Sequence, residues 1–285
     1  MARLTQLVMT SRSNLFAGAR PFVVIATAAV LAGALGGCAA TRPSTGALAA
    51  APAADEAAPA ASEVEARRDV DTWGERYRAN SSDPQVAIRY AQALRVNGQR
   101  AQAVAVLEQA SLHNSKSMEV LGAYGRALAD VGNYQQALEV LGRAHAPDRP
   151  DWRILSAQGA VLDQMGRHED AQRYYETALK IVPDEPSVLS NLGLSYALSK
   201  QLPRAEATLK RAAAGQRVDP RVRQNLALVV GLQGRFAEAE SIARADLPPE
   251  EASANVAYLR EMLSHENDAQ IHDPARRSAS PNNRG

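Results

Sequence analysis

The chain has 285 residues, of which 46% are hydrophobic and 22% are charged. This balance excludes a fully disordered protein and leaves room for one or two domains with a sizeable core. The formal net charge is only +1, so bulk charge favours neither nucleic acid nor an acidic membrane surface as a partner. Aromatic residues make up 5% while alanine is abundant, which favours closely packed helices and hence an all-α fold.

The amino terminus has the pattern of an export signal. Residues 21–37 follow Arg20, carry no charge and are rich in small apolar side chains. A membrane-spanning helix needs about 20 apolar residues, so this run is short for a permanent anchor. We therefore interpret residues 1–37 as a signal peptide, with either Met1 or Met9 as its first residue.

The stretch Leu35-Gly36-Gly37-Cys38 resembles the bacterial lipobox. That resemblance implies diacylglycerol on the Cys38 sulfur, cleavage before Cys38, and attachment to a membrane. Attachment through several acyl chains is stable, whereas a single chain binds only marginally. In lipoproteins of diderm bacteria, an alanine such as Ala39 after the cysteine implies the outer membrane, and we expect its periplasmic face. The alternative is an uncleaved anchor in which Cys38 is incidental.

Residues 38–63 carry the lipidated cysteine and a Pro/Ala-rich linker. The segment has almost no large apolar side chains, so it cannot bury enough surface to offset the entropy of ordering. We predict that it is disordered and that it keeps the folded part close to the membrane but free to move.

An internal repeat of 34 residues follows the linker. Two series of small side chains keep this period without a gap. The first series is Ala91, Gly125, Gly159, Gly193 and Ala227, and the second is Ala103, Ala137, Ala171, Ala205 and Ala239. Small side chains on two helices of each unit allow close approach of their backbones. A larger side chain recurs at Leu107, Leu141, Tyr175 and Leu209, and we expect it to fill the groove toward the neighbouring unit.

Glycine marks the end of the first helix in most units. This series comprises Gly98, Gly132, Gly166 and Gly234, with a lapse at Lys200. A glycine there suits a chain that turns through the left-handed conformation.

The pattern resembles the tetratricopeptide repeat. Its characteristic positions are filled in one unit by Gly159, Ala171, Tyr175, Ala178 and Pro183. The resemblance implies an all-α, right-handed superhelix of about five helix-turn-helix units. We place the units at residues 84–117, 118–151, 152–185, 186–219 and 220–249. In the last unit Ala243 and Asp246 replace the large residue and the alanine after it, so we expect a short or differently packed second helix.

Flanking helices complete the predicted repeat domain, which spans residues 64–265. Residues 64–79 predict a half-repeat helix, with Trp73 one period before Leu107; the alternative is an isolated amphipathic helix. Residues 250–265 predict a capping helix because apolar side chains form one stripe along it. Residues 266–285 have no such stripe and are predicted to be disordered.

The sequence indicates no catalytic or metal chemistry. It contains no HExxH, GxxxxGK[ST] or CxxC motif, and its five histidines are widely spaced. Ser195 lies in "GLSYA", which is faintly similar to a nucleophile motif, but it falls inside a predicted helix and is interpreted as structural. We therefore predict no enzyme activity, no cofactor, no metal and no small-molecule substrate.

The remaining function is binding through the superhelix, whose inner wall in such repeats is lined by the first helices. Early units place polar or mixed residues there, namely Gln92, Arg95, Arg126, Asp130 and Asp163. The last two units place a partner groove there, formed by Asn191, Leu194, Leu198, Asn225, Leu228 and Leu232. Leucines beside amides suit an extended peptide or an amphipathic helix. The alternative is that the capping helix covers these leucines.

Residues 64–265 as a whole resemble the TadD family, the lipoproteins of the tight-adherence (Flp pilus) secretion system. The likeness rests on "RVRQNLALVVGLQGRFAEAE" and "DLPPEEASANVAYLREML", together with the repeats before them. It implies a non-enzymatic outer-membrane lipoprotein that assembles or localises the pilus secretin and its associated proteins, with no nucleic-acid partner. The alternatives are an adaptor that recruits periplasmic hydrolases or proteases, and a component of another outer-membrane assembly complex.

Overall fold

The computed structural model describes residues 61–146, 148–215 and 218–272. Within these residues it contains twelve α-helices, and its only β-structure is an isolated bridge between Ala146 and Arg149. Cys38, residues 39–60 of the predicted linker and the tail beyond residue 272 lie outside the described residues, so the predictions about them stay predictions. Residues 61–63, which were also predicted to be linker, are helical.

The helices form five consecutive hairpins between two flanking helices. The flanking helices are α2 (Ala61–Ala79) and α13 (Pro249–His272). The first helices of the hairpins are α3 (Pro84–Val96), α5 (Met118–Asp130), α7 (Trp152–Gln164), α9 (Pro186–Leu198) and α11 (Pro220–Leu232). The second helices are α4 (Arg100–His113), α6 (Tyr134–Gly142), α8 (His168–Ile181), α10 (Leu202–Ala212) and α12 (Phe236–Ala243). The predicted all-α fold of five units is confirmed.

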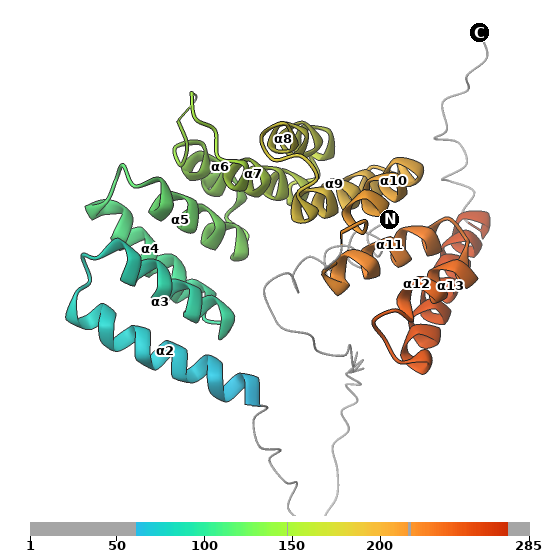
Figure 1. Cartoon of the computed structure of the whole chain (residues 1–285), viewed down its shortest axis with the longest axis horizontal. Helices are drawn as coiled ribbons and strands as arrows, with labels where there is room; N and C mark the ends of the chain where they lie inside the picture. Colours follow the sequence, from blue (N-terminus) through green and yellow to red (C-terminus); the bar gives the residue numbers. More distant parts are fainter. Residues whose placement is uncertain (1–60, 147, 216–217, 273–285) are drawn as a thin grey trace, which may run out of the picture.

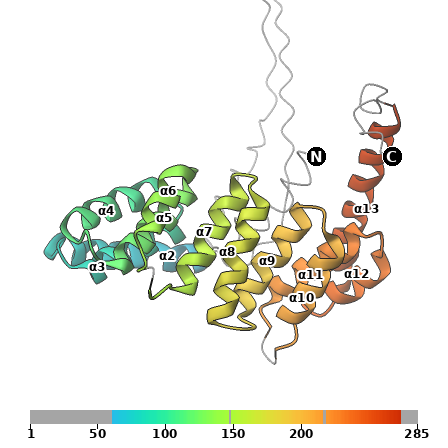
Figure 2. The same cartoon turned by 90° about the horizontal axis from the view of Figure 1, so that it is seen from above.

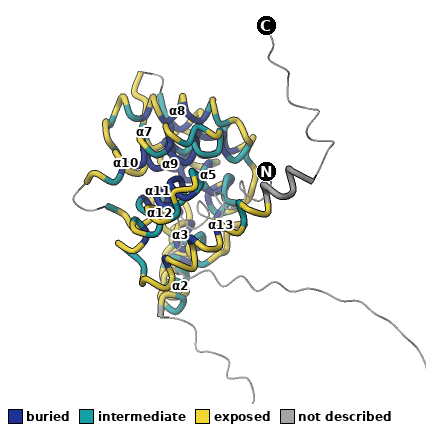
Figure 3. The backbone as a smooth tube through the Cα atoms, turned by 90° about the vertical axis from the view of Figure 1, so that its right-hand side faces the viewer, coloured by how far each residue is buried: buried dark blue, intermediate teal, exposed yellow. Residues whose placement is uncertain are grey.

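The hairpins follow one another along an arc from α2 to α13 (Figure 1), and they stand side by side when the arc is seen from above (Figure 2). Consecutive first helices contact one another from α3 to α11. They therefore form the inner layer of the arc, and the second helices form the outer layer. Buried residues concentrate between the two layers (Figure 3).

Each first helix begins at a capping side chain. The caps are 34 residues apart, at Asp83, Ser117, Asp151, Glu185 and Asp219. Every one of these side chains accepts a hydrogen bond from a backbone N–H of the first helical turn. Such a cap fixes where the helix begins. The sequence analysis singled out the glycine and alanine series but missed this polar one, although its period is the same.

The turn after each first helix has the predicted left-handed backbone. Gly98, Gly132, Gly166 and Gly234 have φ values between 75° and 84°. Lys200, where the glycine series lapses, is also left-handed, with φ of 63°. The geometry of the turn is therefore kept even where a side chain makes it unfavourable.

Replacing Lys200 with glycine should raise the free energy of unfolding by about 1 kcal/mol, because glycine adopts a positive φ without steric conflict. Urea denaturation of Lys200→Gly against the wild type measures the effect. Lys116→Gly is the matched control, since Lys116 is a loop lysine outside the left-handed region. Lys116→Gly should leave the free energy of unfolding unchanged or lower it slightly. A rise equal to that of Lys200→Gly would contradict the explanation by the positive φ of residue 200.

The small and large series meet inside each unit. A Cβ added to Gly159 would lie 2.7 Å from the Tyr175 ring, and one added to Gly193 would lie 2.6 Å from Leu209. The large side chain thus packs over the small residue of its own unit. We expected the large side chain to fill the groove toward the neighbouring unit. Its contact with the small residue of its own unit was not predicted, because that contact depends on how the two helices of one hairpin cross.

Helix α2 packs on α3 as a half-repeat. Its contacts come from Val70, Gly74 and Tyr77, and the Tyr77 and Tyr90 rings stack with centroids 5.4 Å apart. Trp73, expected at the position of Leu107, is only partly buried and carries the Arg76 guanidinium 4.6 Å from its ring. Trp73 is therefore not fully buried as Leu107 is, although the half-repeat helix predicted with it is present.

The carboxy-terminal end departs from the repeat as expected. Helix α12 has only eight residues, and Asp246 is paired with Arg223 on α11 in place of the usual alanine contact. Helix α13 buries Ala252, Val256 and Leu259, three residues of the predicted stripe. The helix ends at His272, so residues 266–272 are helical and not part of the predicted disordered tail. Apolar periodicity underestimated its length because residues 266–272 carry no apolar stripe, although no proline interrupts the chain between Pro249 and Pro274.

Candidate protein-binding surface

The inner wall of the last units is crossed by side-chain hydrogen bonds between neighbouring first helices. Asn191 donates to the Ser156 hydroxyl at 3.4 Å, and Asn225 donates to the Ser190 hydroxyl at 3.0 Å. Both bonds join residues 35 apart in consecutive units. The two amides predicted to face a partner therefore link successive repeats.

The predicted leucine rows are not equally accessible. Leu194 is 2% exposed, so it presents almost no surface to solvent. Leu198, Leu228 and Leu232 are half-buried and have side-chain surface available. The prediction of Leu194 as a groove residue is not supported, because sequence position on a helix face does not reveal which side chains are covered.

The capping helix takes a side of α11 other than the predicted leucine row. Ala227 clusters with Ala252 of α13, and a Cβ added to Gly231 would lie 2.5 Å from Leu259. Helix α13 therefore covers the small residues of α11, while Leu228 and Leu232 stay half-buried. This arrangement favours the groove over full coverage by the cap.

The early units place charged groups on the inner wall. Arg95 and Asp130 form an ion pair between α3 and the end of α5. Burial, together with the nearby charge of Arg95, lowers the pKa of the Arg126 guanidinium, which remains protonated at neutral pH. The charges of Asp151 and Asp130 act on Arg126 in the opposite direction, so two guanidiniums and two carboxylates lie together at this end of the wall.

A buried carboxylate joins the third and fourth units. Asp163 is fully buried and accepts hydrogen bonds from the hydroxyls of Ser195 at 2.8 Å and Tyr175 at 3.0 Å. The His168 Nδ1 lies 2.9 Å from Oδ1 of the same carboxylate. The partners come from α8 and α9, so this one side chain ties three helices together.

Ser195 is not placed as a nucleophile. Its hydroxyl donates to the buried Asp163 carboxylate at 2.8 Å and lies 3.4 Å from the backbone carbonyl of His168. A nucleophilic serine must have its oxygen open to substrate. Ser195 is fully buried, which supports the structural interpretation of "GLSYA". Within the described residues, no group of three or more His, Cys, Asp or Glu side chains could hold a metal ion.

A second polar group joins the fourth and fifth units. Glu206 on α10 accepts from Lys210 at 2.6 Å, Arg235 at 2.7 Å and Gln233 at 2.8 Å. The hydrogen bonds from Lys210, Gln233 and Arg235 lower the pKa of Glu206 to about 2 from its ordinary value of 4.5. The folded protein therefore stabilises the ionised form of the Glu206 side chain.

Glu206 should give the protein an acid-dependent stability. Because its folded pKa is depressed, its contribution is fully present above about pH 4.5 and is lost as the pH falls toward 2. Glu206→Gln should lower the free energy of unfolding by about 1 kcal/mol at pH 7, a value reduced by the exposure of the cationic partners. The difference from the wild type should shrink at pH 3.

Urea denaturation at the two pH values measures this effect. Glu238→Gln is the control, because exposed Glu238 pairs with Arg235 but joins no other unit. It should change stability at pH 7 by less than about 0.5 kcal/mol. A Glu206→Gln deficit as large at pH 3 as at pH 7 would contradict the role given to the Glu206 charge.

These units define a tetratricopeptide-repeat fold, a scaffold suited to protein–protein interaction. Residues 164–229 and 220–245 match sequence families described as "Tetratricopeptide repeat". Residues 72–144 match a family described as "Anaphase-promoting complex, cyclosome, subunit 3". No curated protein sequence matches the chain.

Solved structures with the same fold come from several settings. PilW, described as a widely conserved type IV pilus biogenesis factor, has a TM-score of 0.60 and 16% identity, over 68% of this chain and 91% of that one. A tetratricopeptide repeat protein from Parabacteroides merdae has a TM-score of 0.59 and 11% identity, over 69% of this chain and 78% of that one. The Cut9–Hcn1 complex has a TM-score of 0.54 and 17% identity, over 68% of this chain and 40% of that one. At these identities the likeness shows the fold alone.

Proposed function

We propose that the protein is a lipid-anchored scaffold of the outer membrane that assembles or localises the secretin of the Flp pilus (Tad) secretion machine. The resemblance of residues 64–265 to the TadD family is the observation that carries this proposal. A repeat array with polar and apolar sections on its inner wall supports binding of an extended protein segment. PilW, which has the same fold, is described as a type IV pilus biogenesis factor.

The inner wall supplies two kinds of contact for such a segment. Arg95 and Arg126, together with Asp130 and Asp151, offer charged and hydrogen-bonding groups at one end. Leu228 and Leu232 at the other end can receive apolar side chains. A bound segment would therefore run along the wall with its polar or charged part over α3 and α5 and its apolar part over α11.

Attachment through Cys38 is part of this proposal. None of the helices in the described part of the chain is long and apolar enough to cross a bilayer. In the proposal, acyl chains on Cys38 hold the protein at the periplasmic face of the outer membrane, and the linker lets the repeat domain reach its partner.

Substitution of the inner-wall leucines tests the binding role. Leu228→Glu with Leu232→Glu should abolish pilus formation and secretin recovery in a pulldown, while the circular dichroism spectrum stays helical. Leu112→Glu is the control, since Leu112 is 71% exposed in the first unit, outside the proposed groove. Normal piliation by a folded Leu228→Glu, Leu232→Glu protein would overturn the proposed groove.

Substitution of the anchor residue tests localisation separately. Cys38→Ser should leave an unlipidated precursor that is absent from the outer-membrane fraction, because the acyl chains provide most of the membrane affinity. Ala39→Asp should keep the lipid but redirect the protein to the inner membrane. Membrane fractionation with metabolic labelling by palmitate measures both outcomes. Wild-type localisation of Cys38→Ser would overturn the anchor.

A further inference from the structure

The outer face carries two depressions at equivalent places in consecutive units. The larger, with a volume of about 420 Å³, lies between α8 and α10 over α9, and is lined in part by Glu176, Lys180, Leu192, Tyr196, Arg204 and Arg211. The smaller, of about 200 Å³, lies between α6 and α8 over α7, and is lined by Leu138, Gln158, Leu162, Arg167, Asp170, Arg173 and Tyr174. Gln158 and Leu192 are 34 residues apart, as are Leu162 and Tyr196. The depressions are therefore the same groove repeated, with α8 as their common wall.

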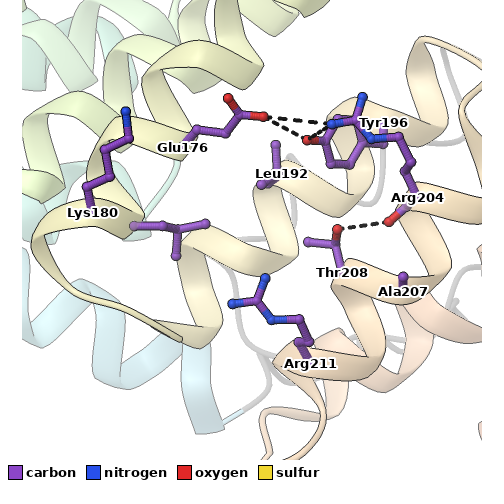
Figure 4. Close-up of a pocket in the computed structure, with 9 residues that line it drawn as sticks. Glu176, Lys180, Leu192, Tyr196, Arg204, Ala207, Thr208 and Arg211 are labelled. Carbon is purple, nitrogen blue, oxygen red and sulfur yellow. Dashed lines mark hydrogen bonds and ion pairs between the residues drawn. The ribbon is translucent and has the colours of Figure 1, made fainter.

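The larger depression has an apolar floor and a charged rim. Leu192, which is 4% exposed, forms the floor. Glu176 and Lys180 extend from α8 on one side, and Arg204 and Arg211 extend from α10 on the other (Figure 4). The Arg204 guanidinium lies 4.1 Å from the centroid of the Tyr196 ring.

Internal contacts hold one end of this rim rigid. The Tyr196 hydroxyl donates to Glu176 at 2.9 Å and accepts from Arg204 at 2.7 Å. Burial and the hydrogen bond to Glu176 raise the pKa of Tyr196 to about 12, so it stays a neutral donor at neutral pH. A preformed rim reduces the entropy lost when a ligand binds.

The linings carry more positive than negative charge. Together they contain five cationic side chains, Arg167, Arg173, Lys180, Arg204 and Arg211, and two carboxylates, Asp170 and Glu176. Asp170 is shared by Arg167 and Arg173, and Arg211 pairs with Asp184 outside the lining. Lys180 forms no ion pair with any described residue. A negatively charged ligand complements this surface.

The smaller depression holds a buried amide that lacks a partner. Gln158 is 4% exposed, and its Oε1 accepts no hydrogen bond within the described part of the chain. A buried acceptor without a donor costs about 1 to 3 kcal/mol. A backbone N–H from a bound chain would supply the missing donor. In the next unit the same position is Leu192, so the fold itself does not require a polar residue there.

We propose that the two depressions form one docking track on the outer face for an extended acidic segment of a partner protein. Carboxylates of the segment pair with Lys180 and Arg211, an apolar side chain rests on Leu192, and a backbone N–H donates to Gln158. This track runs between the second helices, with outward-facing residues of α7 and α9 at its base, and is separate from the inner wall, so one protein can hold two partners at once.

A peptide segment fits these features better than an anionic bilayer. A bilayer surface cannot reach the Gln158 oxygen, which lies at a buried position. Asp170 and Glu176 would also weaken the attraction of a uniformly anionic surface, whereas a flexible segment can place its own charges away from them.

Fluorescence anisotropy of the full chain with a labelled synthetic peptide tests the track. The peptide is built from repeated units of glutamate, leucine, glycine and glutamate, and a second peptide replaces every glutamate with glutamine. We expect Lys180→Glu with Arg211→Glu to weaken binding of the acidic peptide about tenfold or more, since each reversal adds repulsion to the lost attraction. The glutamine peptide should bind at least tenfold more weakly to the wild type.

Two further variants separate the track from general charge effects. Arg100→Glu with Lys116→Glu changes the net charge equally at exposed cations of the first unit, and should leave binding unchanged. Gln158→Leu should weaken the peptide several-fold without lowering the thermal midpoint, because leucine occupies the same position in the next unit. A purely structural role for Gln158 would leave binding unaltered and would remove it from the track.

Vesicles of phosphatidylglycerol and phosphatidylcholine test whether an anionic bilayer, and not an acidic peptide, binds the track. We expect no vesicle binding that depends on Lys180 and Arg211. Absence of peptide binding, equal binding of the acidic and glutamine peptides, or binding of vesicles alone would overturn the proposal. Because these readouts need no pilus, they can fail independently of the proposed role in secretin assembly.

Discussion

Asp163→Ala should lower the free energy of unfolding by about 3 to 5 kcal/mol, because it removes a buried charged hub and leaves its donors without an acceptor. The carboxylate is fully buried and accepts from Ser195 and Tyr175, with His168 against the same oxygen as Ser195. These partners lie in two neighbouring units. The substitution should therefore uncouple the units as well as destabilise them, and urea unfolding should become less cooperative.

The control for Asp163 is a partly buried acid in a local ion pair. Glu240 pairs with Arg244 one helical turn away, and Glu240→Ala should change stability by about 0.5 kcal/mol or less. Asp163→Asn should fall between the two, because an amide keeps one acceptor oxygen in place. If Asp163→Ala were no more destabilising than Glu240→Ala, the carboxylate would not be the hub that its contacts indicate.

Gly159→Ala should destabilise the protein by about 1 to 3 kcal/mol, although alanine is the better helix former by about 1 kcal/mol. The added Cβ would lie 2.7 Å from the Tyr175 ring, which is fully buried and cannot move aside. Relief of this clash requires the two helices of the third hairpin to separate. Chemical denaturation monitored by circular dichroism measures the loss.

Two comparisons make the Gly159 prediction specific. Gly142→Ala should be neutral or stabilising, because an added Cβ there meets only the Gln158 amide nitrogen at 4.0 Å. Tyr175→Leu should partly rescue Gly159→Ala, since the first unit already combines alanine and leucine at Ala91 and Leu107. The double variant should then be less destabilised than the sum of the single variants. Strict additivity would show that Gly159 and Tyr175 do not oppose one another.

The central hairpins connect the two binding surfaces. Helix α7 supplies Asp163 to the buried hub and Gln158 to the outer track, and α9 supplies Ser195 to the hub and Leu192 to the track. The positions of Gln158 and Leu192 in the track therefore depend on the contacts of the hub, which hold α7 and α9 together. Variants of the hub should weaken peptide binding only when they also lower stability, whereas Gln158→Leu should weaken it alone.

Much of the fold could be predicted from the sequence because its steric requirements repeat. The small residues, the large residue over them and the glycine at the turn each recur every 34 positions, and each has a narrow choice of side chain. The helix caps at Asp83, Ser117, Asp151, Glu185 and Asp219 carry the same period and could have been found in the same way.

The candidate surfaces were predicted less completely. The amides Asn191 and Asn225 were predicted to line the partner groove, but they bond to serines 35 residues earlier. The outer track was missed because its members vary from unit to unit, as with Gln158 and Leu192. Variable positions leave no periodic signal, and their meaning depends on which helices they lie between.

The sequence by itself determined the number of units, the places where the chain turns and the helical character of the whole domain. These properties follow from local sterics and backbone conformation, which short segments encode. Only the tertiary structure decided that Leu194 is covered, that Asp163 joins three helices and that α13 covers Ala227 and Gly231 while Leu228 stays half-buried. Those outcomes depend on how neighbouring units pack and on side-chain contacts between them, which no single repeat specifies.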